Sequence, residues 1–138
     1  MMGSKSRMQG KVSPERSANP VYVGIDVCKD RLDVYIHPVG QRLQVGNDPV
    51  GVRKLKRALA VHADVLVVME ATGKFHRAAY RSLDADGFAV AVVNPLRARL
   101  FAEALGALAK TDGVDCKMLA IFGQGADPAA KPPPGEVM

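Results

Sequence analysis

The first part of the chain follows the two-residue period of β-strands. Residues 21–27 (VYVGIDV) form a β-branched run, and apolar residues occupy every second position of 31–38. A shorter segment at 41–47 (QRLQVGN) completes the series. Such alternation places successive side chains on opposite faces of a strand. Because the connections between the segments are short, we predict a three-stranded antiparallel meander.

From residue 48 onward, helical and apolar segments alternate. Asp48 and Pro49 are typical of a helix start, and apolar residues follow at helical spacing. The apolar runs at 64–71 and 88–94 predict strands that are covered on both faces. Each of these strands is followed by a predicted helical segment, which is the pattern of β-α units.

Three further helices complete the predicted order β-β-β-α-β-α-β-α-α. The helix over 72–86 is predicted to bury Phe75, a second helix spans 95–109, and a third spans 112–123 after a Thr111 cap. Because crossovers between parallel strands are right-handed, this order predicts an α/β fold. Its centre is a mixed five-stranded sheet, three antiparallel strands and then β-α-β-α, with helices on both faces.

The two ends of the 138-residue chain differ in composition from its centre. Residues 1–20 are polar and basic, which predicts a disordered N-terminal tail, while 125–138 contain three consecutive prolines and predict a linker or tail. We expect 21–124 to fold as one domain. No apolar run approaches the roughly 20 residues of a membrane span, and no apolar signal segment follows the basic start, so we expect a cytoplasmic protein without membrane contact.

Charge and cysteine content narrow the classes of function. The formal net charge of +5 suits a polyanionic partner. Cys28 and Cys116 form no C-x-x-C pair, which predicts ordinary reduced thiols. Basic residues on the predicted helices either contact phosphates or are simply solvated, and both interpretations stay open for Lys74, Arg77, Arg81, Arg97, Arg99 and the first helix.

Four carboxylates are candidates for a shared site. Asp26 and Glu70 lie at the ends of predicted strands, where sites of open α/β sheets gather. Asp112 and Asp115 are three residues apart, which places both on one face of a helix. Each acid also has a simpler interpretation, because a strand-end acid can reach solvent and acids are favoured in the first turn of a helix.

If the four acids converge, their mutual repulsion requires divalent cations. Oxygen ligands of this kind suit Mg²⁺ or Mn²⁺. Two such metals are a common device for displacement at phosphorus, so the combination indicates phosphoryl transfer on nucleic acid.

Four stretches of the sequence resemble a known family. The chain is similar to the N-terminal DEDD domain, with a RuvC-like ribonuclease H fold, of insertion-sequence transposases related to the Piv DNA invertases. The resemblance covers nearly all of residues 21–123. It rests on the stretches GIDVCKDRLDV (24–34), VVMEATGKF (67–75), VAVVNPLRARLFAEALG (90–106) and AKTDGVDCKMLA (109–120).

The resemblance implies a specific activity and site. It assigns Asp26, Glu70, Asp112 and Asp115 as catalytic metal ligands for magnesium-dependent cutting and joining of DNA in transposition. It also implies an element-encoded guide RNA in some members, and we expect the full-length protein to be a homo-oligomer. The family has a residue such as Ser or Ala where this chain has Cys28. It also carries a C-terminal domain with a nucleophilic serine, so we expect this chain to be truncated before that domain and incomplete as an enzyme.

Two alternatives remain at this point. An ATPase of the actin and sugar-kinase type also has a phosphate loop after a Gly-Ile-Asp strand, but that loop continues with Gly and Ser or Thr rather than Val27-Cys28-Lys29. The other alternative is an inactive transposase remnant that binds only nucleic acid or other subunits. Metal binding by the four acids is the property that would distinguish an active enzyme from this remnant.

Overall fold

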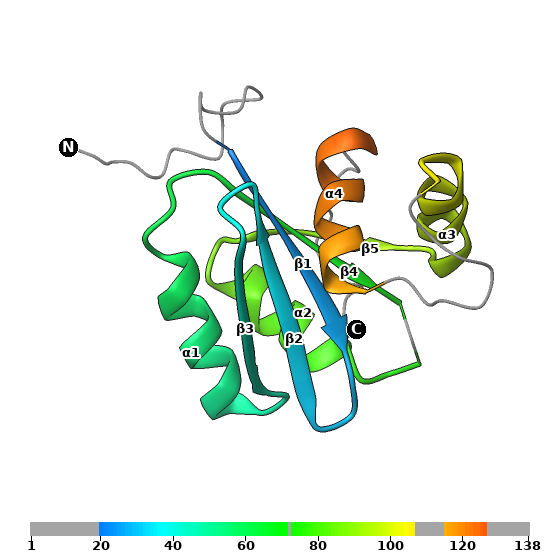
Figure 1. Ribbon diagram of the computed structural model, residues 1–138. Helices are drawn as coiled ribbons and strands as arrows, with labels where there is room; N and C mark the ends of the chain where they lie inside the picture. The colour runs from blue at the N-terminus through cyan, green and yellow to red at the C-terminus, as the bar shows by residue number, and fades with distance from the viewer. Residues whose placement is uncertain (1–19, 72, 107–114, 127–138) are drawn as a thin grey trace.

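A mixed five-stranded sheet forms the centre of the computed structural model (Figure 1). The structure describes residues 20–71, 73–106 and 115–126. The strand order β3-β2-β1-β4-β5 confirms the predicted α/β, ribonuclease H-like fold. The strands are β1 (Val21–Val27), β2 (Arg31–His37), β3 (Gln41–Gly46), β4 (Val65–Glu70) and β5 (Ala89–Val93). The helices in the described residues are α1 (Pro49–Leu59), α2 (Arg77–Ala85), α3 (Pro95–Ala104) and α4 (Cys116–Ala126).

Strand direction divides the sheet into the two parts that the sequence predicts. β1, β2 and β3 form an antiparallel meander, whereas β4 runs parallel to β1 and β5 runs parallel to β4. β1 therefore lies at the junction, with an antiparallel neighbour on one side and a parallel neighbour on the other. This places the carboxyl ends of β1 and β4 side by side.

Apolar side chains cover both faces of the sheet. On one face Val23 and Ile25 pack in a core that includes Leu55 of α1 and Leu83 of α2. On the other face a smaller core joins β1 and β4 to α3 and α4, with Leu119 fully buried. In Figure 1, α4 lies in front of the sheet and α2 lies behind it. None of the helices in the described ranges combines the length and apolar character needed to cross a bilayer.

Close contact with Gly24 fixes α4 over the middle of β1. A Cβ atom at Gly24 would overlap the carbonyl oxygen of Cys116 and lie 2.5 Å from the amide nitrogen of Ala120. Only glycine therefore permits this approach of helix to strand. The contact holds the start of α4 beside the carboxyl half of β1.

Several predicted helix bounds were wrong where they can be compared. α2 begins at Arg77 rather than near residue 72, because residues 73–76 form turns and Gly73 has a φ of 62°. The predicted burial of Phe75 was also wrong, since it is 41% exposed. α3 ends at Ala104, and its predicted extension over 107–109 lies outside the described residues. Almost all of the predicted tails, 1–20 and 125–138, lie outside them too.

Candidate metal centre

Two aspartates face each other at the carboxyl end of β1. The β1–β2 register pairs Asp26 with Asp33, and both are half-buried. Strand alternation directs Asp26 away from the core that holds Ile25 and toward the face that α4 covers. Asp33 was not predicted as a site residue. The three-residue connection 28–30 was the available signal, because a tight hairpin fixes which residue lies opposite Asp26.

Glu70 ends the neighbouring parallel strand. The β1–β4 register runs to the pair Ile25–Met69, so Asp26 and Glu70 are the next residues along the two strands. Burial raises the pKa of Glu70 above its ordinary value, and the negative charge of Asp26 adds to this rise. The structure therefore brings Glu70 within electrostatic range of Asp26.

Asp115 approaches the same place from the start of α4. Its carboxylate Oδ1 accepts a hydrogen bond from the amide of Met118 at 3.0 Å, and its carbonyl accepts one from Leu119 at 3.0 Å. Asp115 is thus the N-cap of α4 and not a residue inside that helix, which corrects the predicted helix start. Asp112 and Thr111 lie outside the described residues.

The charges of these carboxylates act on Asp26. The pKa of Asp26 is raised above its ordinary value of 3.8, first by burial and then by the negative charges of Asp33 and Asp115, while Arg31 opposes the rise. A raised carboxyl pKa means that the folded protein disfavours the anion at this position. A bound cation would remove this penalty.

Cys28 joins this acidic cluster. One ligand atom from each of Asp26, Cys28 and Asp33 lies within 4.8 Å of those of the other two. Cys28 and Cys116 are free thiols, as the sequence predicts, but the position of Cys28 beside the two aspartates was not predicted. Its carbonyl is fixed by the Asn47 side chain, which donates at 2.8 Å to that oxygen and at 3.0 Å to the carbonyl of Phe75.

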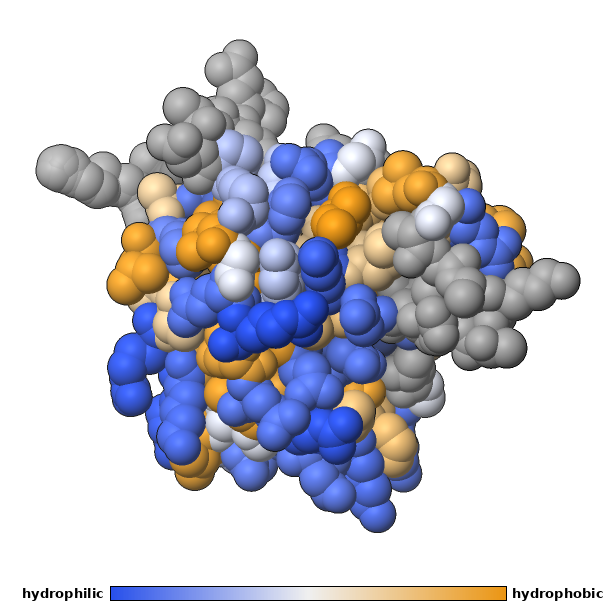
Figure 2. All heavy atoms as spheres, in the orientation of Figure 1, coloured by the Kyte–Doolittle hydropathy of each residue, from blue (hydrophilic) through white to orange (hydrophobic). Residues whose placement is uncertain are grey.

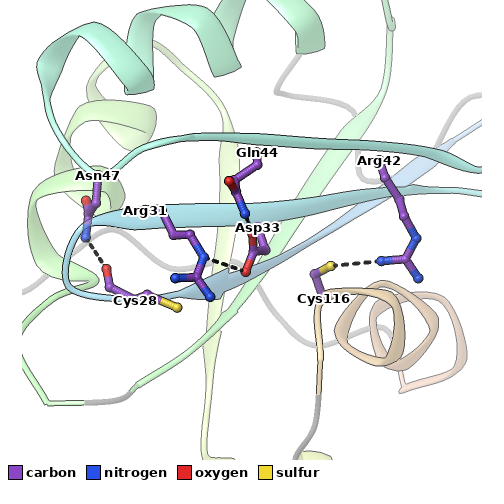
Figure 3. Close-up of polar contacts among 7 residues, drawn as sticks. All are labelled: Cys28, Arg31, Asp33, Arg42, Gln44, Asn47 and Cys116. Atoms are coloured by element: carbon purple, nitrogen blue, oxygen red, sulfur yellow. Dashed lines mark hydrogen bonds and ion pairs between the residues drawn. The ribbon is translucent and has the colours of Figure 1, made fainter.

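Hydrogen bonds from two neighbours orient the Asp33 carboxylate (Figure 3). Gln44 Nε2 donates to Oδ1 at 2.6 Å, and Arg31 Nε donates to Oδ2 at 3.3 Å. In the same view the Arg42 guanidinium points toward Cys116, with Nη1 3.8 Å from Sγ. Burial raises the pKa of the Cys116 thiol, and the positive charge of Arg42 opposes that rise.

A pocket of about 360 Å³ lies between the first three strands and the start of α4. Glu70 does not line this pocket. It interacts with the cluster through the charge of Asp26, which raises the pKa of Glu70. Carboxylate oxygens are the ligands that Mg²⁺ and Mn²⁺ prefer, so the three aspartates of the wall fit either ion. The polar residues of the wall are Asp26, Asp33, Arg42, Gln44, Asp115 and Cys116.

Comparison with known proteins shows the family of this chain. The model of a transposase family, the DEDD transposases of the IS110 type, matches residues 23–136. The chain belongs to this transposase family. The match includes all the strands from Val23 onward and every residue of the acidic cluster. It agrees with the resemblance found in the sequence.

Two curated relatives are similar to this transposase-family chain. They are the pilin gene-inverting proteins of Moraxella bovis and Moraxella lacunata, each 28% identical over 113 residues. The alignments cover 78% of this chain and 35% of each relative. The chain therefore spans about a third of the length of these relatives.

The dual position of Asp115 allows its two roles to be separated by substitution. Asparagine caps helices about as well as aspartate but has no charge, so Asp115→Asn should change the free energy of unfolding little while weakening Mn²⁺ binding. Asp115→Ala should weaken binding and also lose about 1 kcal/mol of stability. Urea unfolding and Mn²⁺ titration of both variants measure the two effects. Equal Mn²⁺ affinity in wild type and Asp115→Asn would exclude Asp115 as a ligand.

Proposed function

We propose that this chain is the metal-dependent catalytic domain of a DNA transposase. In this proposal Asp26, Glu70, Asp112 and Asp115 hold Mg²⁺ or Mn²⁺ for DNA strand cleavage and transfer. The observation that carries the proposal is the position of Asp26, which lies at the end of a central strand within electrostatic range of carboxylates from β4 and from the start of α4. Membership of the transposase family supports the same conclusion.

The residues of the site have distinct roles in this proposal. Asp26 is the central ligand, Glu70 and Asp115 approach from its two neighbouring elements, and Asp112 completes the set from outside the described residues. Paired divalent cations would supply activation of the attacking oxygen and stabilisation of the leaving oxygen at phosphorus. Asp33, held by hydrogen bonds, keeps a further negative charge beside Asp26.

The partners of the whole protein follow from the same proposal. DNA is the substrate, consistent with relatives whose names describe the inversion of a gene. An element-encoded guide RNA and self-association belong to the proposal for the full-length protein. The main alternative is a remnant that binds nucleic acid or other subunits without performing chemistry.

Mn²⁺ titration of Glu70→Gln tests the proposal. The substitution keeps the size of the side chain but removes one anionic ligand, so the dissociation constant for Mn²⁺ should rise about tenfold or more. Isothermal titration calorimetry of the 138-residue chain measures this constant. Asp86→Asn is the matched control, because Asp86 pairs with Lys56 at 2.8 Å at the end of α2 and should leave Mn²⁺ binding unchanged. Equal affinity in wild type and Glu70→Gln would favour the binding remnant.

A further inference from the structure

A half-buried polar surface continues from the acidic pocket along β2. Asp33 and Tyr35 point to the same face of this strand, and Tyr35 is two residues, or roughly 7 Å, further along. The β2–β3 register places Arg42 directly opposite Tyr35. One more step along the strand, His37 Nε2 lies 2.9 Å from Oε1 of Gln124 on α4. The face of the molecule seen in Figure 2 is largely hydrophilic.

Two cations from different elements meet on the ring of Tyr35. The guanidinium carbon of Arg42, on β3, lies 5.0 Å from the ring centroid. Nζ of Lys117, on α4, lies 5.9 Å from the same centroid. Both side chains belong to exposed residues. The aromatic ring thus holds two positive charges together at the edge of the pocket, a contact that is favourable for each cation.

Neither cation is neutralised by a carboxylate in the part of the chain that the structure describes. Arg42 contacts the thiol of Cys116 and the Tyr35 ring, although it lines a pocket whose wall contains three aspartates. Arg31 differs, because it pairs with Asp33 at 3.3 Å. Within the described ranges, two adjacent cations that form no ion pair with a carboxylate can attract an external anion.

We propose that Arg42 and Lys117, gathered on Tyr35, bind the phosphate backbone of a nucleic-acid strand and lead that strand to the acidic pocket. Two features favour a phosphodiester chain. The cations lie on the ring of Tyr35, which is two residues along β2 from Asp33, so one nucleic-acid strand can contact both sites. The polar side chains of His37 and Gln124 continue the same line. The inference deepens the proposed function and rests on it for the identity of the substrate.

Binding of a fluorescently labelled 20-base-pair DNA duplex in EDTA tests the inference without metal. The double variant Arg42→Gln/Lys117→Gln should raise the dissociation constant about tenfold and reduce the slope of log K against log salt by about two. The matched control is Arg53→Gln/Lys54→Gln on α1, which removes the same charge from the opposite face and should change binding much less. The charge-conserving variant Arg42→Lys/Lys117→Arg should retain most of the affinity.

Two results would overturn the inference. One is a wild-type chain that fails to bind the duplex even at low salt, and the other is equal loss of affinity in both charge-removing variants. Melting temperatures of all variants establish that they are folded. The Mn²⁺ titration of Glu70→Gln is independent of this experiment. Metal binding without DNA binding would contradict only the inference about Arg42 and Lys117. DNA binding through Arg42 and Lys117 without metal binding would contradict only the proposed metal-dependent chemistry.

Discussion

Replacing Asp26 by asparagine is expected to abolish the rise in melting temperature that Mn²⁺ causes, while leaving the metal-free protein at least as stable as the wild type. The substitution removes the central ligand, and it also removes an anion that burial, Asp33 and Asp115 disfavour. At 100 times the dissociation constant, bound Mn²⁺ should stabilise the wild type by about 2.7 kcal/mol, or roughly 10 °C. Thermal melts of both proteins with EDTA and with Mn²⁺ measure these effects.

The stability difference between the two proteins should also depend on pH. The pKa of Asp26 is raised in the folded state, so between the ordinary value of 3.8 and the raised value the folded protein binds more protons than the unfolded chain. Stability contributed by this group therefore falls as pH rises through that window. The metal-free wild type should be least stable relative to Asp26→Asn near neutral pH and should approach it in acid.

The outcome is informative in both directions. A metal-free Asp26→Asn variant that melts well below the wild type would mean that Asp26 stabilises the fold through contacts of its own. An equal Mn²⁺ response in both proteins would mean that the cluster is not a competent metal site. Asp86→Asn again serves as the control for loss of a carboxylate, because Asp86 lies at the end of α2 and pairs with Lys56.

Gly24→Ala is expected to cause the largest loss of folding stability, on the order of 3 kcal/mol. The added methyl group would overlap the carbonyl oxygen of Cys116, and a backbone atom can move only if α4 shifts as a unit. Such a shift carries Asp115 away from Asp26. Urea unfolding should therefore show reduced stability. In the absence of urea, where the variant remains folded, its affinity for Mn²⁺ should also be lower than that of the wild type.

Gly51→Ala is the matched control for this variant. A Cβ at Gly51 would overlap the backbone of Gly46, so this variant should also lose stability, but the clash lies between α1 and β3. Mn²⁺ affinity of the folded protein should then be close to that of the wild type. If both glycine variants weaken Mn²⁺ binding equally, the position of α4 does not control the site.

The sheet could be predicted from sequence because each strand carries its own pattern. The period of two in β2 predicts that one face of this strand is buried. The apolar runs of β4 and β5 predict that both faces of these strands are covered. The start of α2 could not be predicted in this way, because Phe75 has helical spacing from Ala79 although Gly73 takes a left-handed backbone conformation. A backbone angle of this kind depends on the turn after β4 and is not encoded in the apolar spacing.

The sequence predicted only those residues of the candidate site that are marked by their position at the end of a strand. Asp26 and Glu70 are conspicuous because each lies at the carboxyl end of an apolar strand. Asp33 looks like an ordinary solvent-facing residue of an alternating strand, and only pairing across the hairpin brings it beside Asp26. Arg42 and Lys117 are far apart in sequence, so their meeting on Tyr35 depends on the packing of α4.

The amide group of Asn47 has a consequence for local unfolding of the site. It donates to the carbonyl of Cys28, in the connection after β1, and to the carbonyl of Phe75, in the segment after β4. Separating either segment from Asn47 breaks one of these bonds and loosens the side chain that holds the other. We therefore expect the connection 28–30 and residues 73–76 to open together, with a shared free energy of hydrogen exchange.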